Sequence, residues 1–287
     1  MNTGVFMKPQ CVGILHPGEM GISVAASAKN SGCEVYWASE GRGAATRERV
    51  AKIGLHEAST VGELCAQCPF VISVCPPHAA EDVANQVIRA GFHGLFVDAN
   101  AIAPQRTIKI SEAMSKADIA FVDGGIIGLP AWKPHATCLY LSGPRSEEIA
   151  QCFSAGPLDT IVLGDEIGKA SALKMCYAAN TKGTVALLAA IVATAETLGV
   201  REALFERWKH DDSALPGSVE KRIQANAPKA WRFVGEMEEI SRTFRDAGAP
   251  GEFHEGAADI YTRLAGFKDA RTPPTLEELL AALTIRH

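Results

Sequence analysis

The chain has 287 residues, of which 47% are hydrophobic and 21% charged, and its formal net charge is -5. This length and apolar content suffice for two domain cores, and the slightly acidic balance provides no basic surface for a nucleic acid or an anionic lipid. We therefore predict a two-domain protein that acts on a small-molecule substrate, with neither a nucleic acid nor a membrane as a partner.

The start of the chain and the cysteines indicate the compartment. Residues 1–10 lack the basic stretch followed by an apolar run that marks a secretory signal. The eight cysteines are scattered, without the density of a small disulfide-rich scaffold. Only Cys65 and Cys68 form a CxxC pair, and no second pair follows at zinc-binding spacing. We expect a cytoplasmic protein with reduced thiols and no metal site.

Short apolar segments alternate with helical patterns through the first half of the chain. Stretches such as residues 21–31 and 79–90 are long enough for right-handed crossover helices. This alternation predicts an N-terminal Rossmann domain of α/β class, a doubly wound parallel sheet with helices on both faces. The expected strands are residues 11–15, 34–37, 70–74, 95–97, 119–122 and 137–141.

Helical patterns alone fill the second half, beginning with a long one over residues 167–198. Its most apolar part, residues 185–195, is shorter than the roughly 20 residues that a membrane-spanning helix needs. We predict a dinucleotide-binding domain over residues 1–164 and an all-α substrate and dimerisation domain over 165–287. Residues 185–192 need more cover than one small helical domain provides, so we expect a homodimer.

A glycine-containing turn follows the first strand, in residues 13–21 (GILHPGEMG). Gly18 would let the backbone approach a pyrophosphate, and Gly21 would allow the helix to pack closely on the strand. His16 stands where the first glycine of the GxGxxG pattern is expected, but the strand–turn–helix setting favours a dinucleotide site over an ordinary turn. The expected cofactor contacts in this turn are His16, Pro17, Gly18, Glu19 and Met20.

The end of the second strand bears on the choice between NAD and NADP. An NAD enzyme usually presents an acidic side chain here to the ribose hydroxyls, and this place falls on Ser39. The guanidinium of Arg42 would suit a 2′-phosphate, with Arg47 as a second candidate. Glu40 favours NAD instead, and a solvated helix start accounts equally well for both arginines. We predict NADP as the preferred cofactor and NAD as the alternative.

The order of these segments resembles the 3-hydroxyacid dehydrogenase family, which includes 3-hydroxyisobutyrate dehydrogenase and the cofactor domain of 6-phosphogluconate dehydrogenase. Residues 71–77 (VISVCPP) look like the family's fourth strand and the loop over the cofactor, and residues 98–104 (DANAIAP) look like the next strand-end loop. Both loops leave the carboxyl ends of strands, where open α/β sheets bind ligands. The resemblance implies cofactor contacts at Cys75, Pro76, Pro77 and Asn100, and a substrate contact at Ala101.

Residues 123–130 (DGGIIGLP) occupy the place of the family's carboxylate-binding motif, a DAPVSGG type of sequence. Ile127 and Leu129 stand where the family has a serine and a second glycine. These changes remove a hydroxyl and hinder close backbone approach to a carboxylate. The resemblance therefore implies that Ile127, Gly128 and Leu129 shape a pocket unlike that for the usual small hydroxyacids.

Residues 164–174 (GDEIGKASALK) resemble the stretch that carries the family's catalytic lysine, which makes Lys174 the candidate general acid and base. Between Leu173 and Met175 this lysine would be partly desolvated, and its neutral form would be favoured. A lysine that reaches from a buried helix to solvent is the alternative interpretation.

Further substrate contacts are expected in the second half. The family's asparagine, one turn after the lysine, is replaced by Ala178, so Asn180 and Lys182 are the nearest candidates on this helix. Glu236 and Glu239 fall where the family has a Lys-Asp pair, a pattern that looks like a bacterial phosphogluconate dehydrogenase-like subgroup. They would meet a cationic or polyhydroxylated substrate, or simply form a solvated acidic face.

These features predict hydride transfer between a nicotinamide and a small hydroxyacid, polyol or carbonyl compound, with Lys174 exchanging the proton. One alternative is an imine reductase-like enzyme that reduces C=N with NADPH, because related folds do so and the carboxylate motif is altered. Another is a non-catalytic dinucleotide-binding sensor, for which the altered motif and the missing asparagine are the motivation.

Overall fold

The computed structural model describes residues 10–268, 270 and 272–284. The chain forms two compact units, Met1–Lys174 and Met175–His287, each of which is described by itself. The division falls inside a helix, beyond residue 164, where the strand signal of the sequence stops. The prediction about a secretory signal concerns residues that, apart from Gln10, lie outside the described part of the chain.

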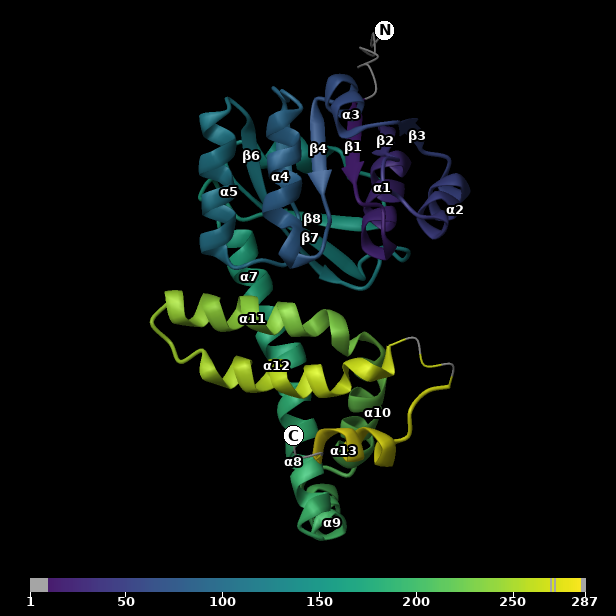
Figure 1. The fold of residues 1–287 in the computed structure, drawn as a ribbon, viewed down its shortest axis with the longest axis vertical. Coiled ribbons are helices and arrows are strands. Elements are labelled where there is room, and N and C mark those ends of the chain that lie inside the picture. Colours follow the sequence, from purple (N-terminus) through teal and green to yellow (C-terminus); the bar gives the residue numbers. More distant parts are fainter. Residues whose placement is uncertain (1–9, 269, 271, 285–287) are drawn as a thin grey trace, which may run out of the picture. The chain divides into compact units, whose positions relative to one another are not determined.

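The first unit contains an eight-stranded sheet in the order β3-β2-β1-β4-β5-β6-β7-β8 (Figure 1). Every neighbouring pair is parallel except β6 with β7. All residues of β4 and β5 are buried, as expected for central strands covered on both faces. The predicted Rossmann-type α/β fold is confirmed. The strands are β1 (Cys11–Leu15), β2 (Glu34–Ala38), β3 (His56–Ala58), β4 (Phe70–Ser73), β5 (Leu95–Asp98), β6 (Ala120–Gly128), β7 (Thr137–Ser142) and β8 (Leu158–Val162).

The sheet contains two strands that were not predicted, β3 and β8, and one strand, β7, that runs antiparallel to its neighbour β6. Strand β3 has only three residues, too few to show an alternating pattern, and β8 buries only Leu158 at the sheet edge. Strand β7 runs antiparallel to β6, with Asp123 opposite Ser142 and Gly128 opposite Thr137. Residues 129–136 between them are too few for the crossover helix that a parallel return would need.

Helices cover both faces of the sheet and enclose two hydrophobic cores. One core joins α1 and α6 to the sheet through residues such as Val24 and Ile149. The other joins α3, α4 and α5 to the opposite face through residues such as Leu64, Val83 and Met114, and Figure 1 shows α4 and α5 in front of the strands. The helices are α1 (Glu19–Asn30), α2 (Ala44–Ile53), α3 (Val61–Gln67), α4 (Ala80–Arg89), α5 (Pro104–Lys116) and α6 (Ser146–Gln151).

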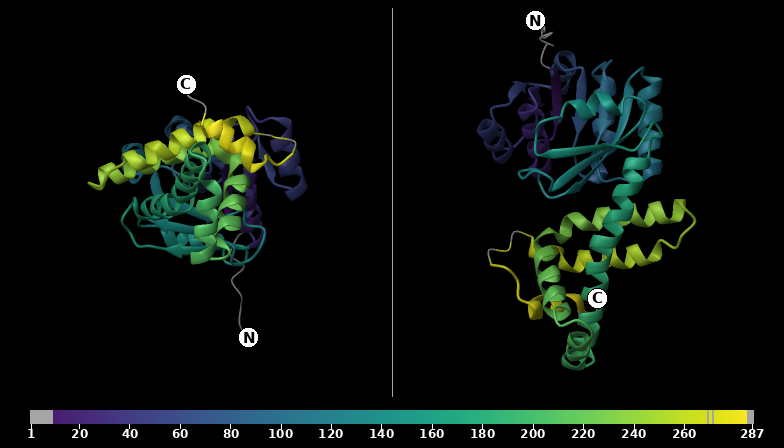
Figure 2. Two further views of the ribbon diagram at one scale, coloured as in Figure 1. Left: turned by 90° about the horizontal axis from the view of Figure 1, so that it is seen from below. Right: turned by 180° about the vertical axis from the view of Figure 1, so that it is seen from behind.

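The second unit is built from helices, with no strand among its described residues, as predicted. Helices α11 and α12 lie side by side and antiparallel, and α8 packs against α10, α12 and α13 (Figures 1 and 2). A π turn over Ala179–Gly183 separates α7 from α8. The helices are α7 (Lys169–Ala178), whose first part belongs to the first unit, α8 (Thr184–Thr197), α9 (Arg201–Asp211), α10 (Leu215–Asn226), α11 (Ala230–Asp246), α12 (Glu252–Leu264) and α13 (Leu276–Thr284).

Helix α7, the π turn and α8 form one continuous helical segment, Lys169–Thr197, of 29 residues. Its most apolar 18-residue window has a mean hydropathy of 1.3, so by length and composition the segment could cross a membrane. The apolar stretch of residues 185–195, on which the sequence prediction rested, is too short to show this. Since 44% of the window is buried within the protein, and core helices of soluble proteins meet the same criterion, this single segment is weak evidence for a membrane span.

Candidate functional site

The turn between β1 and α1 has the backbone geometry of a ligand-binding turn. His16 adopts φ 66°, a left-handed conformation that favours glycine, at the place of the motif's first glycine. A Cβ on Gly21 would lie 2.5 Å from the His16 carbonyl oxygen, so only glycine fits there. Around Gly18 the space is open, and no side chain caps the N-terminus of α1. A ligand can therefore approach the backbone and the positive end of this helix.

Arg42 contacts this turn through the ring of His16, with Arg42 Nη2 2.8 Å from His16 Nε2. Because a guanidinium can only donate, His16 Nε2 accepts this bond and the ring proton resides on Nδ1. Burial, assisted by the charge of Arg42, lowers the pKa of His16 to about 4, so the ring is neutral at pH 7. The pair joins the end of β2 to the turn after β1.

Two buried donors of this pair remain unsatisfied. His16 Nδ1 and Arg42 Nε have no hydrogen bond of good geometry among the described residues, and the Leu15 carbonyl interacts with the His16 ring only enough to offset part of the lowering of its pKa. Such groups are rare in folded proteins because leaving them unpaired costs free energy. An anionic group at the turn would accept from both, so these residues fit the phosphate groups of a dinucleotide.

The contacts at the end of β2 give Arg42 and Arg47 different roles. Ser39 is buried, and its carbonyl oxygen accepts a hydrogen bond from Arg47 Nη2 at 3.1 Å. Arg47 also pairs with Glu57 at 3.2 Å and lies over the Trp37 ring, so it is engaged in holding β2 and α2 together. Glu40 is exposed. Arg42 is therefore the arginine placed to meet a ligand at the glycine turn.

Asn100 connects the loops after β4 and β5. Its Oδ1 accepts from the backbone nitrogen of Cys75 at 2.5 Å, and its Nδ2 donates to Ser73 Oγ at 3.2 Å. Its own backbone nitrogen donates to Asp98 Oδ1 at 3.0 Å. We expected this side chain to face the cofactor, and the structure shows it buried and bonded to the neighbouring loop. Asn100 therefore holds the loops after β4 and β5 against each other.

The other loop residues surround Asn100 at the strand ends. Cys75 and Ala101 are half-buried, Pro76 is exposed, and Pro77 opens a short 3-10 helix. Strands β2, β1, β4 and β5 are adjacent and parallel, so their carboxyl ends lie along one edge of the sheet. The structure thus brings the candidate cofactor residues of four segments to a single edge.

Lys174 is the last residue of the first unit and stands half-buried on α7. Helix α7 packs against β6 at Gly125, where an added Cβ would lie 3.3 Å from Lys174 Cβ. The candidate substrate residues at the end of the same strand are half-buried or exposed, with 69% of Leu129 accessible to solvent. Strand β6 therefore carries the altered substrate motif and also supports the candidate lysine.

In the second unit, Lys182 and Glu236 form an ion pair in which both side chains are largely buried. The Phe233 ring lies 4.7 Å from Lys182 Nζ, and the Tyr261 hydroxyl donates to the Lys182 carbonyl oxygen at 2.8 Å. The structure thus pairs two residues that we predicted as separate substrate contacts. The π turn that carries Lys182 is of a kind often found at functional sites.

The two other candidates of the second unit do not join this pair in the contacts described. Glu239 is buried, and its carboxylate accepts a hydrogen bond from Arg242 Nη1 at 3.0 Å. Asn180 is exposed on the π turn. The acidic face expected from the sequence is therefore partly neutralised by basic side chains within the unit.

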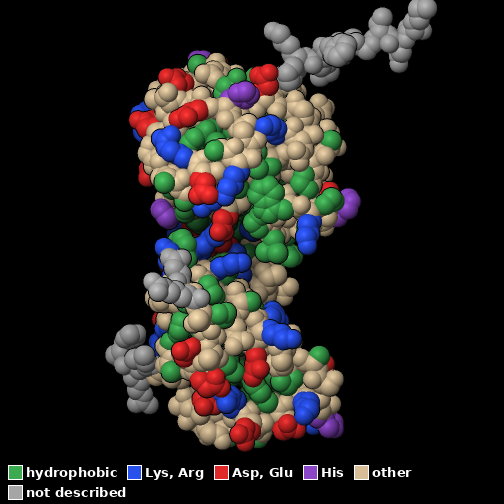
Figure 3. All heavy atoms as spheres, turned by 90° about the vertical axis from the view of Figure 1, so that its right-hand side faces the viewer, with side chains coloured by type: hydrophobic (Ala, Val, Ile, Leu, Met, Phe, Trp, Pro, Cys, Tyr) green, Lys and Arg blue, Asp and Glu red, His purple; other side chains and the backbone are tan. Residues whose placement is uncertain are grey.

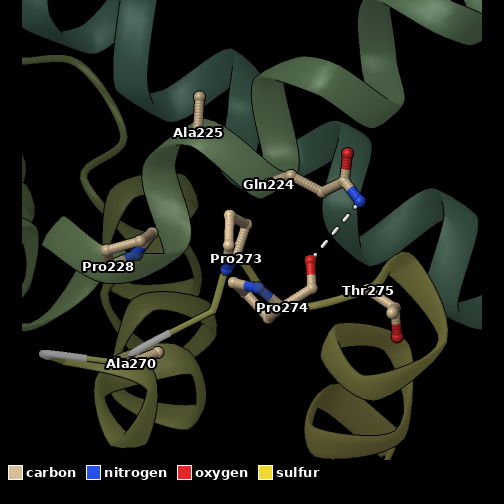
Figure 4. A pocket seen from close by; sticks show the side chains of 7 residues that line it. All are labelled: Gln224, Ala225, Pro228, Ala270, Pro273, Pro274 and Thr275. Atoms are coloured by element: carbon tan, nitrogen blue, oxygen red, sulfur yellow. Dashed lines mark hydrogen bonds between the residues drawn. The ribbon is translucent and has the colours of Figure 1, made fainter.

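Two surface hollows lie away from these residues. One, of about 510 Å³, is in the second unit beside the prolines of residues 273–274, where Gln224 Nε2 donates to the Pro274 carbonyl oxygen at 3.4 Å (Figure 4). Another, of about 540 Å³, lies in the first unit beside α5 and includes Lys116 and Arg145. Neither is lined by a candidate site residue. Acidic and basic side chains are interspersed over the face shown in Figure 3.

Comparison with known proteins identifies the two parts of the chain. Residues 11–154 match the family described as the NAD binding domain of 6-phosphogluconate dehydrogenase, and residues 195–264 match a domain of unknown function, DUF1932. A structure of the conserved protein MTH1747 of unknown function, described as similar to 3-hydroxyacid dehydrogenases, is 29% identical. The match covers 88% of this chain and 97% of that chain, and the TM-score is 0.67.

More distant structures share the fold. The 3-hydroxyisobutyrate dehydrogenase of Mycobacterium tuberculosis is 16% identical, with 97% of this chain and 100% of that chain covered and a TM-score of 0.68. A reductive aminase from Aspergillus terreus is 16% identical, with 96% and 99% covered and a TM-score of 0.57. The match over residues 11–154 spans half of the sequence, so this chain belongs to the family of the NAD binding domain of 6-phosphogluconate dehydrogenase, within the 3-hydroxyacid dehydrogenase-like proteins.

Proposed function

We propose that the protein is an NADP-dependent oxidoreductase that acts on a small hydroxyl- or carbonyl-bearing compound. The observation that carries this proposal is the pair of buried, unsatisfied donors, His16 Nδ1 and Arg42 Nε, at the open turn before α1. Phosphate groups of a bound dinucleotide would supply acceptor oxygens to these donors. When bound, the nicotinamide supplies or accepts the hydride, and the protein holds the reactants and moves the proton.

The preference for NADP over NAD rests on the end of β2. The place of the acidic residue that recognises ribose hydroxyls is taken by Ser39, and the exposed carboxylate beside it belongs to Glu40. Arg42 offers a guanidinium whose charge matches a 2′-phosphate. Since Arg47 is held by Glu57 and the Ser39 carbonyl, the preference depends on Arg42.

Lys174 is the proposed general acid and base. During reduction its ammonium would donate a proton to the developing alkoxide oxygen, and during oxidation its amine would take the proton from the substrate hydroxyl. The apolar side chains of Ile127 on β6 and Leu129 just after it would contact the apolar part of the substrate. Small hydroxyacids, polyols, aldehydes and ketones are therefore the compounds to test.

Reduction of a C=N bond is the second candidate. The carboxylate motif of the family is replaced by Ile127 and Leu129, and the ammonium of Lys182 is already paired with Glu236. Both features favour an uncharged or cationic substrate over an anionic one. Oxidation of NADPH with a cyclic imine such as 2-methyl-1-pyrroline, at a rate above that with any aldehyde, would select this candidate.

Substitution of Lys174 tests the chemical role. With the best substrate from a panel of aldehydes, ketones and cyclic imines, we expect Lys174→Ala to reduce turnover by about 10²–10⁴-fold, the usual contribution of a general acid or base. NADPH affinity should stay within twofold of the original. Lys169→Ala is the matched control, because Lys169 is an exposed lysine on the same helix.

Full turnover by Lys174→Ala would show that Lys174 is not the general acid and base. Tight NADPH binding without consumption of NADPH across the whole panel would instead support the non-catalytic sensor.

We also propose that α8 contributes to a homodimer interface. Leu187 and Ile191 are one turn apart on α8, Leu198 follows at its C-terminal end, and all three are exposed. The expected result is a dimer in sedimentation velocity at micromolar concentration, and a shift to monomer on Leu187→Lys. A monomer in the unaltered protein would contradict this proposal.

A further inference from the structure

Asp123 on β6 is a buried carboxylate to which four hydrogen bonds are donated. Its Oδ2 accepts from the backbone nitrogens of Gly168 and Ser171 and from Ser142 Oγ, each at 3.0 Å. Its Oδ1 accepts from Ser171 Oγ at 2.6 Å. An ionised carboxylate only accepts, so the four donors favour the charged form and oppose the rise in the pKa of Asp123 that its burial causes.

These bonds satisfy the N-terminus of α7. Besides the two backbone donors on Asp123, the backbone nitrogen of Ala170 donates to Ser142 Oγ at 3.1 Å. The hydroxyls of Thr107 and Ser171 are 2.9 Å apart, which extends the network to α5. The first backbone N–H groups of a helix have no partner within it, and a negative charge there is stabilising. Side chains of β6 and β7 therefore fasten α7 to the sheet.

A close backbone approach reinforces this fastening. A Cβ on Gly125 would lie 2.6 Å from the Ala170 carbonyl oxygen and 3.3 Å from Lys174 Cβ, so the strand and the helix touch at that glycine. Lys174 follows Ser171 by one helical turn. It is also the last residue of the compact unit that contains the glycine turn.

We infer that Asp123 is a positioning residue, which fixes α7 to β6 and thereby makes Lys174 a rigid part of the dinucleotide-binding unit. The consequence for turnover rests on the proposed function of Lys174, whereas the placement of the lysine does not. Asp123→Asn removes the charge and places a side-chain N–H group against the backbone N–H groups of α7, which cannot accept a hydrogen bond from it. The first turn of α7 would therefore loosen.

The test measures Lys174 directly. Competitive labelling with acetic anhydride across a pH series, followed by mass spectrometry, gives the reactivity and titration midpoint of each lysine. In Asp123→Asn we expect Lys174 to be acetylated at least ~3-fold faster relative to Lys116, because loosening of the first turn of α7 exposes the amine. The exposed Lys116 serves as the internal reference, and the exposed Asp118→Asn as the matched control.

Hydrogen exchange provides the second measurement. The backbone amides of residues 168–174 should exchange at least ~10-fold faster in Asp123→Asn, since their partners lose the ordered carboxylate. Gly125→Ala keeps the charge and should displace α7, accelerating the same amides. Gly62→Ala adds the same methyl group in the first unit at an ordinary contact distance, 3.7 Å from Thr60 Oγ1. This second variant keeps the test decisive if Asp123→Asn does not fold.

With a substrate in hand, Asp123→Asn should lower kcat at least ~10-fold while NADPH affinity stays within twofold, since alignment affects the proton-transfer step. Labelling of Lys174 and exchange of residues 168–174 that match the unaltered protein in the folded variants would overturn the inference. If both measurements change while Lys174→Ala keeps full turnover, the positioning stands and the proposed function fails.

Discussion

Two helix N-termini in the first unit are built in opposite ways. That of α7 is closed by Asp123 and Ser142, whose oxygens accept from its backbone nitrogens. That of α1 begins at Gly18 without a side-chain cap, and the neighbouring His16 and Arg42 keep buried donors without partners. A helix end that is fully bonded inside the protein acts as a fastening, whereas one that leaves donors open is prepared for a ligand.

The energetic contrast supports this distinction. Leaving a buried donor unsatisfied costs about 1–3 kcal/mol, a large part of the stability of an ordinary domain. A phosphate bound at the α1 turn would accept hydrogen bonds from these donors and so remove this cost. At the Asp123 carboxylate both oxygens accept hydrogen bonds, which offset part of the cost of burial that raises its pKa. Variants at the two ends should therefore separate binding from stability.

The largest effect is expected at Gly21. In Gly21→Ala the new methyl group would meet the His16 carbonyl oxygen at 2.5 Å, distorting the turn and costing about 1–3 kcal/mol of unfolding free energy. NADPH binding in calorimetry should fall below detection. Gly18→Ala adds its methyl group where the protein leaves space, so it should weaken NADPH binding without altering stability. Unchanged NADPH affinity in both variants would show that the cofactor does not use this turn.

Arg42→Ala should affect the cofactors unequally. Loss of a charge-assisted contact worth about 1.5–3 kcal/mol would weaken NADPH binding by about 10–150-fold. NADH binding should change much less, because NADH has no 2′-phosphate. The control is Arg89→Ala, at an exposed arginine of α4. Equal weakening of both cofactors would move Arg42 from the 2′-phosphate to the shared pyrophosphate.

Ser142→Ala should reduce stability and leave binding unaffected. It removes one donor from Asp123 and leaves the Ala170 N–H without its acceptor, which should cost about 1–3 kcal/mol in urea unfolding. NADPH affinity should remain within twofold. Ser154→Ala, at an exposed serine of the same unit, should change neither quantity. A loss of cofactor affinity without a loss of stability in Ser142→Ala would reverse the distinction between the two helix ends.

The last effect is a pH dependence that arises at Asp98, beside Asp123 in the sheet. Burial raises the pKa of Asp98 from its ordinary value of 3.8 to about 7. As the pH rises between these values, the unfolded chain releases this proton while the folded protein retains it, so stability decreases. Asp98→Asn cannot titrate. The unfolding free energy of the unaltered protein relative to this variant should therefore be greater at pH 5 than at pH 8, and a constant difference would contradict the shift.

Local patterns allowed most of the fold to be predicted. The central strands and the glycine turn are each encoded in a few consecutive residues, so alternation and spacing reveal them. Strand β3 is too short for such a signal, and β8 is an edge strand with one buried residue. The direction of β7 depends on the length of a connection, which an apolar pattern alone does not reveal.

The site was less predictable because its contacts join distant residues. Asn100 bonds the loop of Cys75, and Lys182 pairs with Glu236 from another helix, so neither arrangement follows from local spacing. The network around Asp123 uses hydroxyls from α5, β7 and α7. The sequence marked Asp123 only as the start of a motif, and nothing in its neighbours indicated four donors.

The central claim, that the turn before α1 is an NADP site, is tested most directly by calorimetric titration of the unaltered protein with NADPH and with NADH. We expect one molecule of NADPH per chain, bound at least ~10-fold more tightly than NADH, since one charge-assisted contact is worth that factor or more. Binding of neither cofactor would contradict the account, and equal binding of both would contradict the role given to Arg42.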